Sequence, residues 1–206
     1  MKNTFYVVLI LIIIGLSYLK WQAKDEYSAT PSPSPSPIAS SVPATIDSEV
    51  LETPYFKLEY PVEASSSAQN EGPDSKGWRI YYMGDTQKNS GRTQTELFDG
   101  YIVVVSAFPD VIGDDPALTQ AQADRQGIID GCGVENVTKI ESAKLGTYDT
   151  LSYYGGCLGE SNQYYTMQGS TLFRITEMVV GPESAIPTYK KSTKFIFDSL
   201  KFSEDL

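Results

Sequence analysis

Three aspartates within one short segment of this sequence could bind a metal ion. Asp110, Asp114 and Asp115 directly precede an expected helix, and carboxylate oxygens are the hard ligands that Ca²⁺ prefers in proteins. Their spacing differs from that of an EF-hand loop, and Asp115 followed by Pro116 is also a favoured helix start. We therefore keep the three aspartates as a candidate calcium site, with helix capping as the favoured interpretation and no metal predicted.

Tyrosine, with 14 copies, is the residue type best suited to a binding surface here. Adjacent residues of a strand face opposite sides of a sheet. If two expected hairpins turn about residues 159 and 169, Tyr153, Tyr165 and Phe173 lie on one face of the sheet, toward the core. Tyr154, Tyr164 and Arg174 then lie together on the other face. Tyrosine and arginine are enriched in binding hot spots, so these three residues predict a platform for a glycan or a peptide, unless a helix or the segment 62–76 covers it.

The residue types needed for common catalytic mechanisms are missing. The sequence contains no histidine, which excludes Ser-His-Asp and Cys-His nucleophiles. It also lacks a G-x-S-x-G motif, a phosphate-binding loop and a dinucleotide fingerprint. The single S-x-x-K match, Ser17 to Lys20, lies in the apolar N-terminal segment. No catalytic residue and no cofactor are therefore predicted, and a pair of carboxylates remains the alternative route to hydrolysis.

The chain has two cysteines, Cys132 and Cys157, each next to glycine. Their spacing does not match a C-x-x-C redox motif, and two ligands make a poor zinc site. In an exported domain such a pair predicts one structural disulfide. Two unpaired thiols are the alternative.

Seven segments have the residue pattern of β-strands. They are residues 55–60, 78–83, 101–108, 138–145, 148–154, 162–167 and 171–178. Residues 101–108 are apolar on both parities, which predicts a central strand covered on both faces. Gly146-Thr147 and the residues 168–170 predict hairpin turns, and the polar segments 62–76 and 84–92 predict loops.

Two segments predict helices. The first begins at Asp115-Pro116 and can end at Gly131, and the second spans residues 187–200 with Tyr189, Ile196 and Leu200 along one side. Strands, a helix, four hairpin-linked strands and a final helix predict an α+β domain, with a mainly antiparallel sheet and helices packed against it.

Four phrases of the sequence resemble PsbP-like domains. They are Tyr55-Phe-Lys-Leu-Glu-Tyr-Pro61, the strand phrase 144–154, Ser170-Thr-Leu-Phe-Arg-Ile-Thr176, and Phe195-Ile-Phe-Asp-Ser-Leu-Lys-Phe202. The resemblance covers residues 55 to 202 and consists of element order and phrase type. It implies an α-β-α sandwich and a non-catalytic, extracytoplasmic role, often as an accessory to a membrane complex. It transfers no functional residue.

The N-terminal segment predicts the location of the domain. Residues 5–19 form an unbroken apolar run after Lys2, which is typical of a membrane anchor or a cleaved signal peptide. Small residues are poorly placed for cleavage, so an uncleaved transmembrane helix is favoured. The expected organisation is an anchor over 1–22, a Pro/Ser-rich disordered tether over 23–48 and an extracytoplasmic domain over 49–206.

The net charge of the chain is −10. Nucleic-acid binding requires phosphate-neutralising lysine and arginine residues, so nucleic acid is excluded as a partner. The sequence therefore predicts a membrane-tethered, non-catalytic domain that binds a protein or a cell-envelope component. The alternatives are a secreted hydrolase that uses carboxylates and a calcium-dependent adhesion module.

Overall fold

The computed structural model describes residues 46–72, 75–90, 96–157 and 159–203. The expected anchor over 1–22 and nearly all of the expected tether over 23–48 lie outside these residues. Among the described residues, no helix is both long and apolar enough to cross a bilayer.

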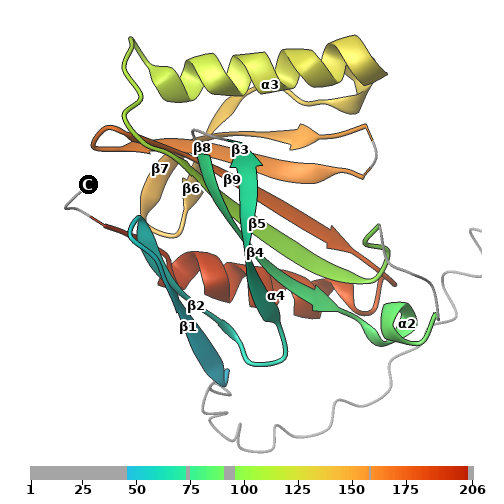
Figure 1. The fold of residues 1–206 in the computed structure, drawn as a ribbon. Coiled ribbons are helices and arrows are strands. Elements are labelled where there is room, and N and C mark those ends of the chain that lie inside the picture. Colours follow the sequence, from blue (N-terminus) through green and yellow to red (C-terminus); the bar gives the residue numbers. More distant parts are fainter. Residues whose placement is uncertain (1–45, 73–74, 91–95, 158, 204–206) are drawn as a thin grey trace, which may run out of the picture. The chain divides into compact units, whose positions relative to one another are not determined.

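A seven-stranded sheet forms the centre of the domain (Figure 1). Its strands follow the spatial order β3 (Ser65–Gly72), β4 (Ser75–Met83), β5 (Gly100–Phe108), β9 (Thr171–Val180), β8 (Ser161–Gln168), β7 (Tyr148–Gly155) and β6 (Glu141–Leu145). Every neighbouring pair is antiparallel. The mainly antiparallel α+β architecture is therefore confirmed.

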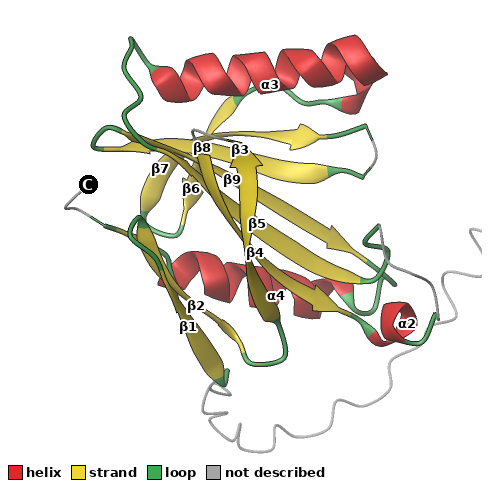
Figure 2. Cartoon of the chain, in the orientation of Figure 1, coloured by secondary structure: helices red, strands yellow, loops and turns green. Residues whose placement is uncertain are grey.

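Two long helices cover opposite faces of this sheet (Figure 2). α3 (Pro116–Cys132) packs against β7, β8 and β9, whereas α4 (Ile186–Ser199) packs against β5 and β9. We call the two sides of the sheet the α3 face and the α4 face. Because each helix covers only part of its face, the other strands on that face are left without a helix above them.

A second sheet of three strands packs beside α4. It contains β1 (Ser48–Glu52), β2 (Phe56–Pro61) and β10 (Lys201–Phe202), in the order β1-β2-β10. The larger apolar core lies between this small sheet, α4 and the α4 face. Its most buried members include Phe56, Ile80, Phe173 and Ile196.

The smaller core lies between α3 and the α3 face of β7, β8 and β9. It contains Ala117, Ala121, Val137, Tyr153, Tyr165 and Leu172. Alanines on α3 let the helix approach the sheet closely, while the tyrosine rings supply most of the buried area. The predicted placement of Tyr153 and Tyr165 in a core is confirmed.

The first helix begins as predicted and ends slightly later. Asp115 is the N-cap, and its carboxylate accepts a hydrogen bond from the backbone N–H of Leu118 at 3.2 Å. The helix continues through Gly131 to Cys132, and Gly133 with φ of 94° forms its C-cap. A short 3-10 turn, η1 (Val134–Asn136), follows it.

The prediction of a loop over residues 62–76 is wrong. This segment contains β3 and the beginning of β4. The residues Ser65 to Ala68 are exposed, so the strand lacks the apolar alternation by which strands are recognised. It is held by backbone pairing with β4, which a side-chain pattern does not reveal. Similarly, the expected loop over 84–92 contains the short helix α2 (Asp85–Lys88).

The coverage predicted for the strand over 101–108 is only half confirmed. β5 is internal to the sheet, and on the α4 face Val103 and Val105 are almost completely buried. On the α3 face, Ile102 and Val104 are only half-buried, because α3 packs against β7, β8 and β9 instead. Two apolar side chains of a central strand therefore lie on a surface that none of the described helices covers.

Candidate functional site

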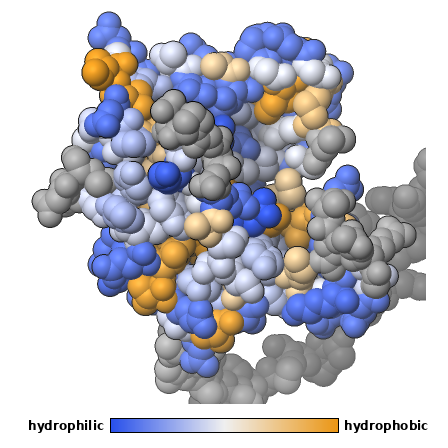
Figure 3. Space-filling view, viewed as in Figure 1, coloured by the Kyte–Doolittle hydropathy of each residue, from blue (hydrophilic) through white to orange (hydrophobic). Residues whose placement is uncertain are grey.

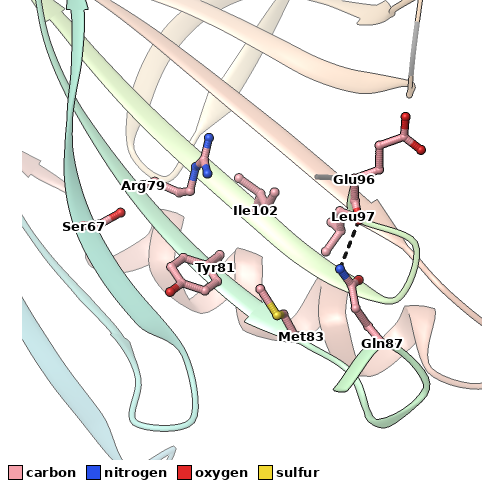
Figure 4. Close-up of a pocket in the computed structure, with 8 residues that line it drawn as sticks. All are labelled: Ser67, Arg79, Tyr81, Met83, Gln87, Glu96, Leu97 and Ile102. Carbon is pink, nitrogen blue, oxygen red and sulfur yellow. Dashed lines mark hydrogen bonds between the residues drawn. The ribbon is translucent and has the colours of Figure 1, made fainter. Parts of the chain in front are cut away.

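The candidate site is a groove on the part of the α3 face that α3 leaves uncovered. Its volume is about 260 Å³. It is lined by Ser67, Arg79, Tyr81, Met83, Gln87, Glu96, Leu97 and Ile102 (Figure 4). We call this site the β4–β5 groove. The alternation of β4 explains it, since Trp78, Ile80 and Tyr82 pack into the core on the other face.

Gln87 stabilises one wall of the groove, which is formed by the residues from Glu96 onward. Its side chain is almost fully buried, and its Nε2 donates to the Glu96 carbonyl at 3.1 Å (Figure 4). Its Oε1 accepts from the backbone N–H groups of Phe98 and Asp99, both at 3.0 Å. One buried amide therefore satisfies three backbone groups, which fixes α2 and the residues after Glu96 as one unit.

Asp99 connects this wall to α4. Its carboxylate is 2% exposed and accepts hydrogen bonds from the backbone N–H of Thr86 at 2.9 Å and from the Tyr189 hydroxyl at 2.8 Å. Gly84 packs so closely against Asp99 and Tyr189 that an added Cβ would lie within 2.4 Å of them. The shape of the groove therefore depends on a buried hydrogen-bond network and does not rest on an exposed loop alone.

Arg79 supplies the positive charge in the groove. With the Gln69 amide oriented as its surroundings favour, Gln69 Oε1 accepts from the Arg79 Nε and Nη2 atoms at 2.8 and 2.9 Å. Among the described residues, no carboxylate forms an ion pair with Arg79. The guanidinium therefore lines the groove together with Ile102 and Tyr81, without an ion pair to a described carboxylate.

The residues that line the β4–β5 groove combine charged and apolar types. Its ionisable side chains are those of Arg79, Tyr81 and Glu96, and its apolar ones are those of Met83, Leu97 and Ile102. Tyrosine, methionine and arginine are the types enriched at the centres of interfaces. The sequence reasoning missed this site because it took residues 62–76 as a loop. Residues 101–108 are apolar at both odd and even positions, and this pattern was the signal that could have indicated the groove.

The register of the β8–β9 hairpin separates the three residues of the predicted platform. Gln168 pairs with Thr171, so the turn has two residues, and Tyr165 lies opposite Arg174. The predicted pairing of Tyr165 with Phe173 is therefore wrong by one residue. Such a shift moves every side chain of a strand to the other face. Arg174 consequently lies on the α3 face, while Tyr154 and Tyr164 lie on the α4 face.

Tyr164 and Tyr154 have different surroundings. The Tyr164 ring packs edge-on against Phe197 of α4 at 5.8 Å between centroids. Burial and the nearby Glu177 carboxylate raise the pKa of Tyr164 well above its ordinary value. Tyr154 is 42% exposed, and its hydroxyl donates to Glu160 at 2.5 Å. The structure therefore places one ring largely against α4 and leaves the other accessible.

Arg174 belongs to a polar network beneath α3. Its Nη1 lies 3.4 Å from Asp124 Oδ2, which also accepts from the Tyr165 hydroxyl at 2.8 Å. The guanidinium lies over the Phe108 ring, 5.6 Å from its centroid. The Tyr153 and Tyr165 hydroxyls are 3.2 Å apart. These contacts join α3 to the sheet, which is a structural role.

The acidic loop does not assemble into a metal site. Asp115 caps α3, and Asp110 has a left-handed backbone with φ of 58°. Within the described ranges, no group of three or more acidic, cysteine or histidine side chains is placed to hold a metal ion. The calcium-dependent alternative therefore has no support from the geometry of Asp110, Asp114 and Asp115.

The predicted disulfide between Cys132 and Cys157 is confirmed. The two Cα atoms are 5.5 Å apart, and 25 residues separate the cysteines in sequence. The bond joins the C-terminal end of α3 to the segment after β7. It therefore links α3 covalently to the part of the chain that forms the sheet beneath it.

The sequence matches no known family model and no curated protein. Several solved structures are similar to the chain. Cyanobacterial PsbP from Synechocystis sp. PCC 6803 is 13% identical, with 82% of this chain and 100% of that chain covered and a TM-score of 0.45. A protein from Bacteroides thetaiotaomicron VPI-5482 is 16% identical, with 73% and 46% covered and a TM-score of 0.41. The match thus spans about half of that protein.

LpqN of Mycobacterium tuberculosis, which is described as involved in cell envelope biogenesis, is 11% identical to this chain. The match covers 76% of this chain and 91% of LpqN, with a TM-score of 0.36. Cyanobacterial PsbP is thus among the solved structures similar to this chain, in agreement with the expected resemblance and at low sequence identity.

Proposed function

We propose that this chain is a membrane-tethered, extracytoplasmic and non-catalytic domain that binds a protein or cell-envelope partner through the β4–β5 groove. One observation carries the proposal. β5 is apolar on both parities, yet on the α3 face Ile102 and Val104 remain half-buried. Apolar side chains of a central strand are normally covered, and a bound partner would complete that coverage.

The composition of the surface supports a binding role. On the side of the molecule drawn in Figure 3, hydrophobic residues form several small groups separated by hydrophilic ones. Around the groove, Tyr81, Met83 and Ile102 provide apolar area, while Arg79 and Glu96 provide opposite charges. A mixed surface of this kind favours a partner that binds reversibly. The interface with a permanent subunit would be more apolar.

Two carboxylates of a second groove, beside α4, do not favour the hydrolase alternative. Beside α4, Glu177 accepts hydrogen bonds from Asn162 at 2.8 Å and from Thr193 at 2.5 Å. Asp198 pairs with Lys194 at 2.5 Å. Glu177 is thus held by neighbouring side chains of the domain, and Asp198 forms a solvent-exposed ion pair.

The N-terminal segment and the cysteines support the proposed location. The apolar run over 5–19 and the Pro/Ser-rich tether lie outside the described residues, and their role is part of the proposal. The Cys132–Cys157 disulfide supports an oxidising compartment, because disulfides persist mainly in exported proteins.

The proposal is tested by photocrosslinking in cells that produce the full chain. A photoreactive phenylalanine analogue replaces Tyr81 in one variant and Tyr154 in a control variant. Tyr154 is likewise a tyrosine on a strand of the large sheet, but it lies on the opposite face and is more exposed than the half-buried Tyr81. We expect a discrete crosslinked partner from position 81 that is lost in an added Arg79→Ala variant. Crosslinks that are identical at both positions, or none at position 81, would contradict the proposal.

A further inference from the structure

We propose that the exposed edge of β3 binds the partner as an added β-strand, so that the partner contributes an extended polypeptide segment whose alternate side chains enter the β4–β5 groove. This inference rests on the proposed function and specifies the chemical class of the partner. It depends on which backbone groups of β3 point outward, on how the edges of the sheets are protected, and on the size of the β3 side chains.

The direction of the β3 backbone groups follows from the neighbouring ladders. In an antiparallel pair, hydrogen-bonded and non-hydrogen-bonded residue pairs alternate. The Gly84 N–H donates to the Asp99 carbonyl at 2.8 Å, in continuation of the β4–β5 register. Even-numbered residues of β4 therefore bond to β5, and odd-numbered residues bond to β3.

The same rule then applies across the β3–β4 pair. Ser65 pairs with Tyr81 and Ser67 pairs with Arg79, so these odd-numbered residues of β3 use their backbone groups in the ladder. The N–H and C=O groups of Ser66 and Ala68 point away from β4. Among the described residues, β3 pairs with β4 alone. Two residues therefore present unpaired donors and acceptors along an exposed edge.

The β3 edge lacks the protection that the other long edges have. Charged side chains and prolines normally prevent edge strands from pairing with other chains. β6 carries Glu141 and Lys144, and β1 carries Glu49 and Glu52. The stretch Ser65–Gln69 contains neither a charge nor a proline, whereas Glu71, the charged residue of β3, follows the irregularity that begins after Gln69. The backbone of this stretch is therefore open to pairing with an added strand.

Small side chains connect this edge to the groove. Ser65 and Ser67 lie on the α3 face, next to the larger Tyr81 and Arg79 of β4. A strand added along β3 would direct every second side chain toward this face. Over a serine, a large apolar side chain can extend toward the Tyr81 ring on β4, whereas a larger β3 residue would block it. An extended segment with alternating apolar residues therefore fits both the edge and the groove.

The test uses the purified full chain in detergent and a display library of unstructured peptides of about 10 residues, which is enough to span the edge. Amide hydrogen exchange is measured with and without each selected peptide. In the unbound chain, we expect fast exchange at Ser66 and Ala68 and slow exchange at Ser67. Peptide binding should slow exchange at Ser66 and Ala68 at least tenfold.

A proline variant separates backbone pairing from side-chain contact. Ala68→Pro removes an outward N–H, which an edge strand tolerates, and we expect at least a tenfold loss of peptide affinity with unchanged folding. The matched control Ala68→Val keeps the N–H and should bind within about twofold of the original chain. Ser66→Pro provides a second variant at the same edge, in case Ala68→Pro disturbs the fold.

Each outcome is decisive. Peptides that bind through Tyr81 but are insensitive to Ala68→Pro would overturn the added-strand inference and leave the proposed function intact. A library that yields no binder, or binders that leave Ser66 and Ala68 unprotected, would also overturn it. Concentration-dependent protection without peptide would show that a second copy of the chain occupies the edge. If position 81 gives no crosslink in cells that produce the otherwise unchanged chain, the result would instead contradict the proposed function itself.

Discussion

The Tyr189 hydroxyl donates a 2.8 Å hydrogen bond to the buried Asp99 carboxylate, although 90 residues separate them in sequence. Tyr189 lies on α4 and Asp99 lies directly before β5, so this contact connects the α4 layer to the wall of the β4–β5 groove. Burial of the ring, with the hydrogen bond to Asp99 and its negative charge, raises the pKa of Tyr189 from 10.0 to about 12.

This relationship predicts a loss of stability at alkaline pH. The unfolded chain releases the tyrosine proton near pH 10, whereas the folded chain keeps it until about pH 12. The folded state therefore binds more protons in this window, and the free energy of unfolding falls as pH rises through it. The stabilisation from Tyr189 is complete below pH 10. Urea unfolding at a series of pH values should show a shallower decline for Tyr189→Phe than for the original chain.

Other buried tyrosines also contribute to the alkaline decline, so the test is the difference between the two proteins. Burial raises the pKa of Tyr101 and Tyr165 as well, and both are unchanged in Tyr189→Phe. Tyr55→Phe serves as the control, because the hydroxyl of Tyr55 has no hydrogen bond among those of the described residues. If the free energy of unfolding declined in parallel for Tyr189→Phe and the original chain between pH 10 and 12, the assignment of the raised pKa to Tyr189 would be refuted.

The Tyr165 hydroxyl should contribute measurably to stability. It donates to Asp124 at 2.8 Å and lies 3.2 Å from the Tyr153 hydroxyl, within a ring that is 1% exposed. Tyr165→Phe removes both contacts and leaves the buried Tyr153 hydroxyl without this partner, which costs about 1–3 kcal/mol, while Asp124 keeps its contacts with Arg174 and Gln120. Tyr154→Phe removes only an exposed bond to Glu160 and should change the free energy of unfolding by less than about 0.5 kcal/mol. Chemical denaturation distinguishes the two, and equal effects would contradict the buried network.

Reduction of the disulfide should destabilise the domain without changing the groove. The Cys132–Cys157 bond closes a loop of 25 residues, for which loop entropy predicts a contribution of about 3–4 kcal/mol. We expect the double variant Cys132→Ser, Cys157→Ser to unfold at lower urea concentration, and reductant to have no further effect on it. Thiol titration of the unreduced, denatured chain should detect no free thiol. Two titrating thiols would show that the bond does not form in the native protein.

The proposed topology predicts accessibility from outside the membrane. Protease added to intact cells or spheroplasts should release a soluble domain by cleavage between the apolar run over 5–19 and β1. The disulfide-linked domain should itself resist cleavage, because its backbone is largely paired in sheets and helices. A cytoplasmic marker protein serves as the control for intact membranes. Full protection of the chain, with the marker also protected, would contradict the extracytoplasmic location.

Local signals in the sequence were sufficient to predict most of the elements. Asp115-Pro116 predicts the start of α3 because an N-cap carboxylate and a proline at the first helical position act within one turn. Gly146-Thr147 predicts the β6–β7 turn for a similarly local reason. The cysteine pair predicts the disulfide, because few cysteines in an exported chain leave few alternatives.

Only the tertiary structure decided which side chains share a surface. The β8–β9 turn has two residues instead of three, so Arg174 lies on the α3 face while Tyr164 packs against α4. Similarly, β3 forms because β4 offers it a backbone ladder, and α3 leaves β5 half-covered because it packs over β7 to β9. The side-chain period of a strand is two, so a one-residue difference in a turn exchanges the faces. Contacts between distant segments select that register, and no local pattern records them.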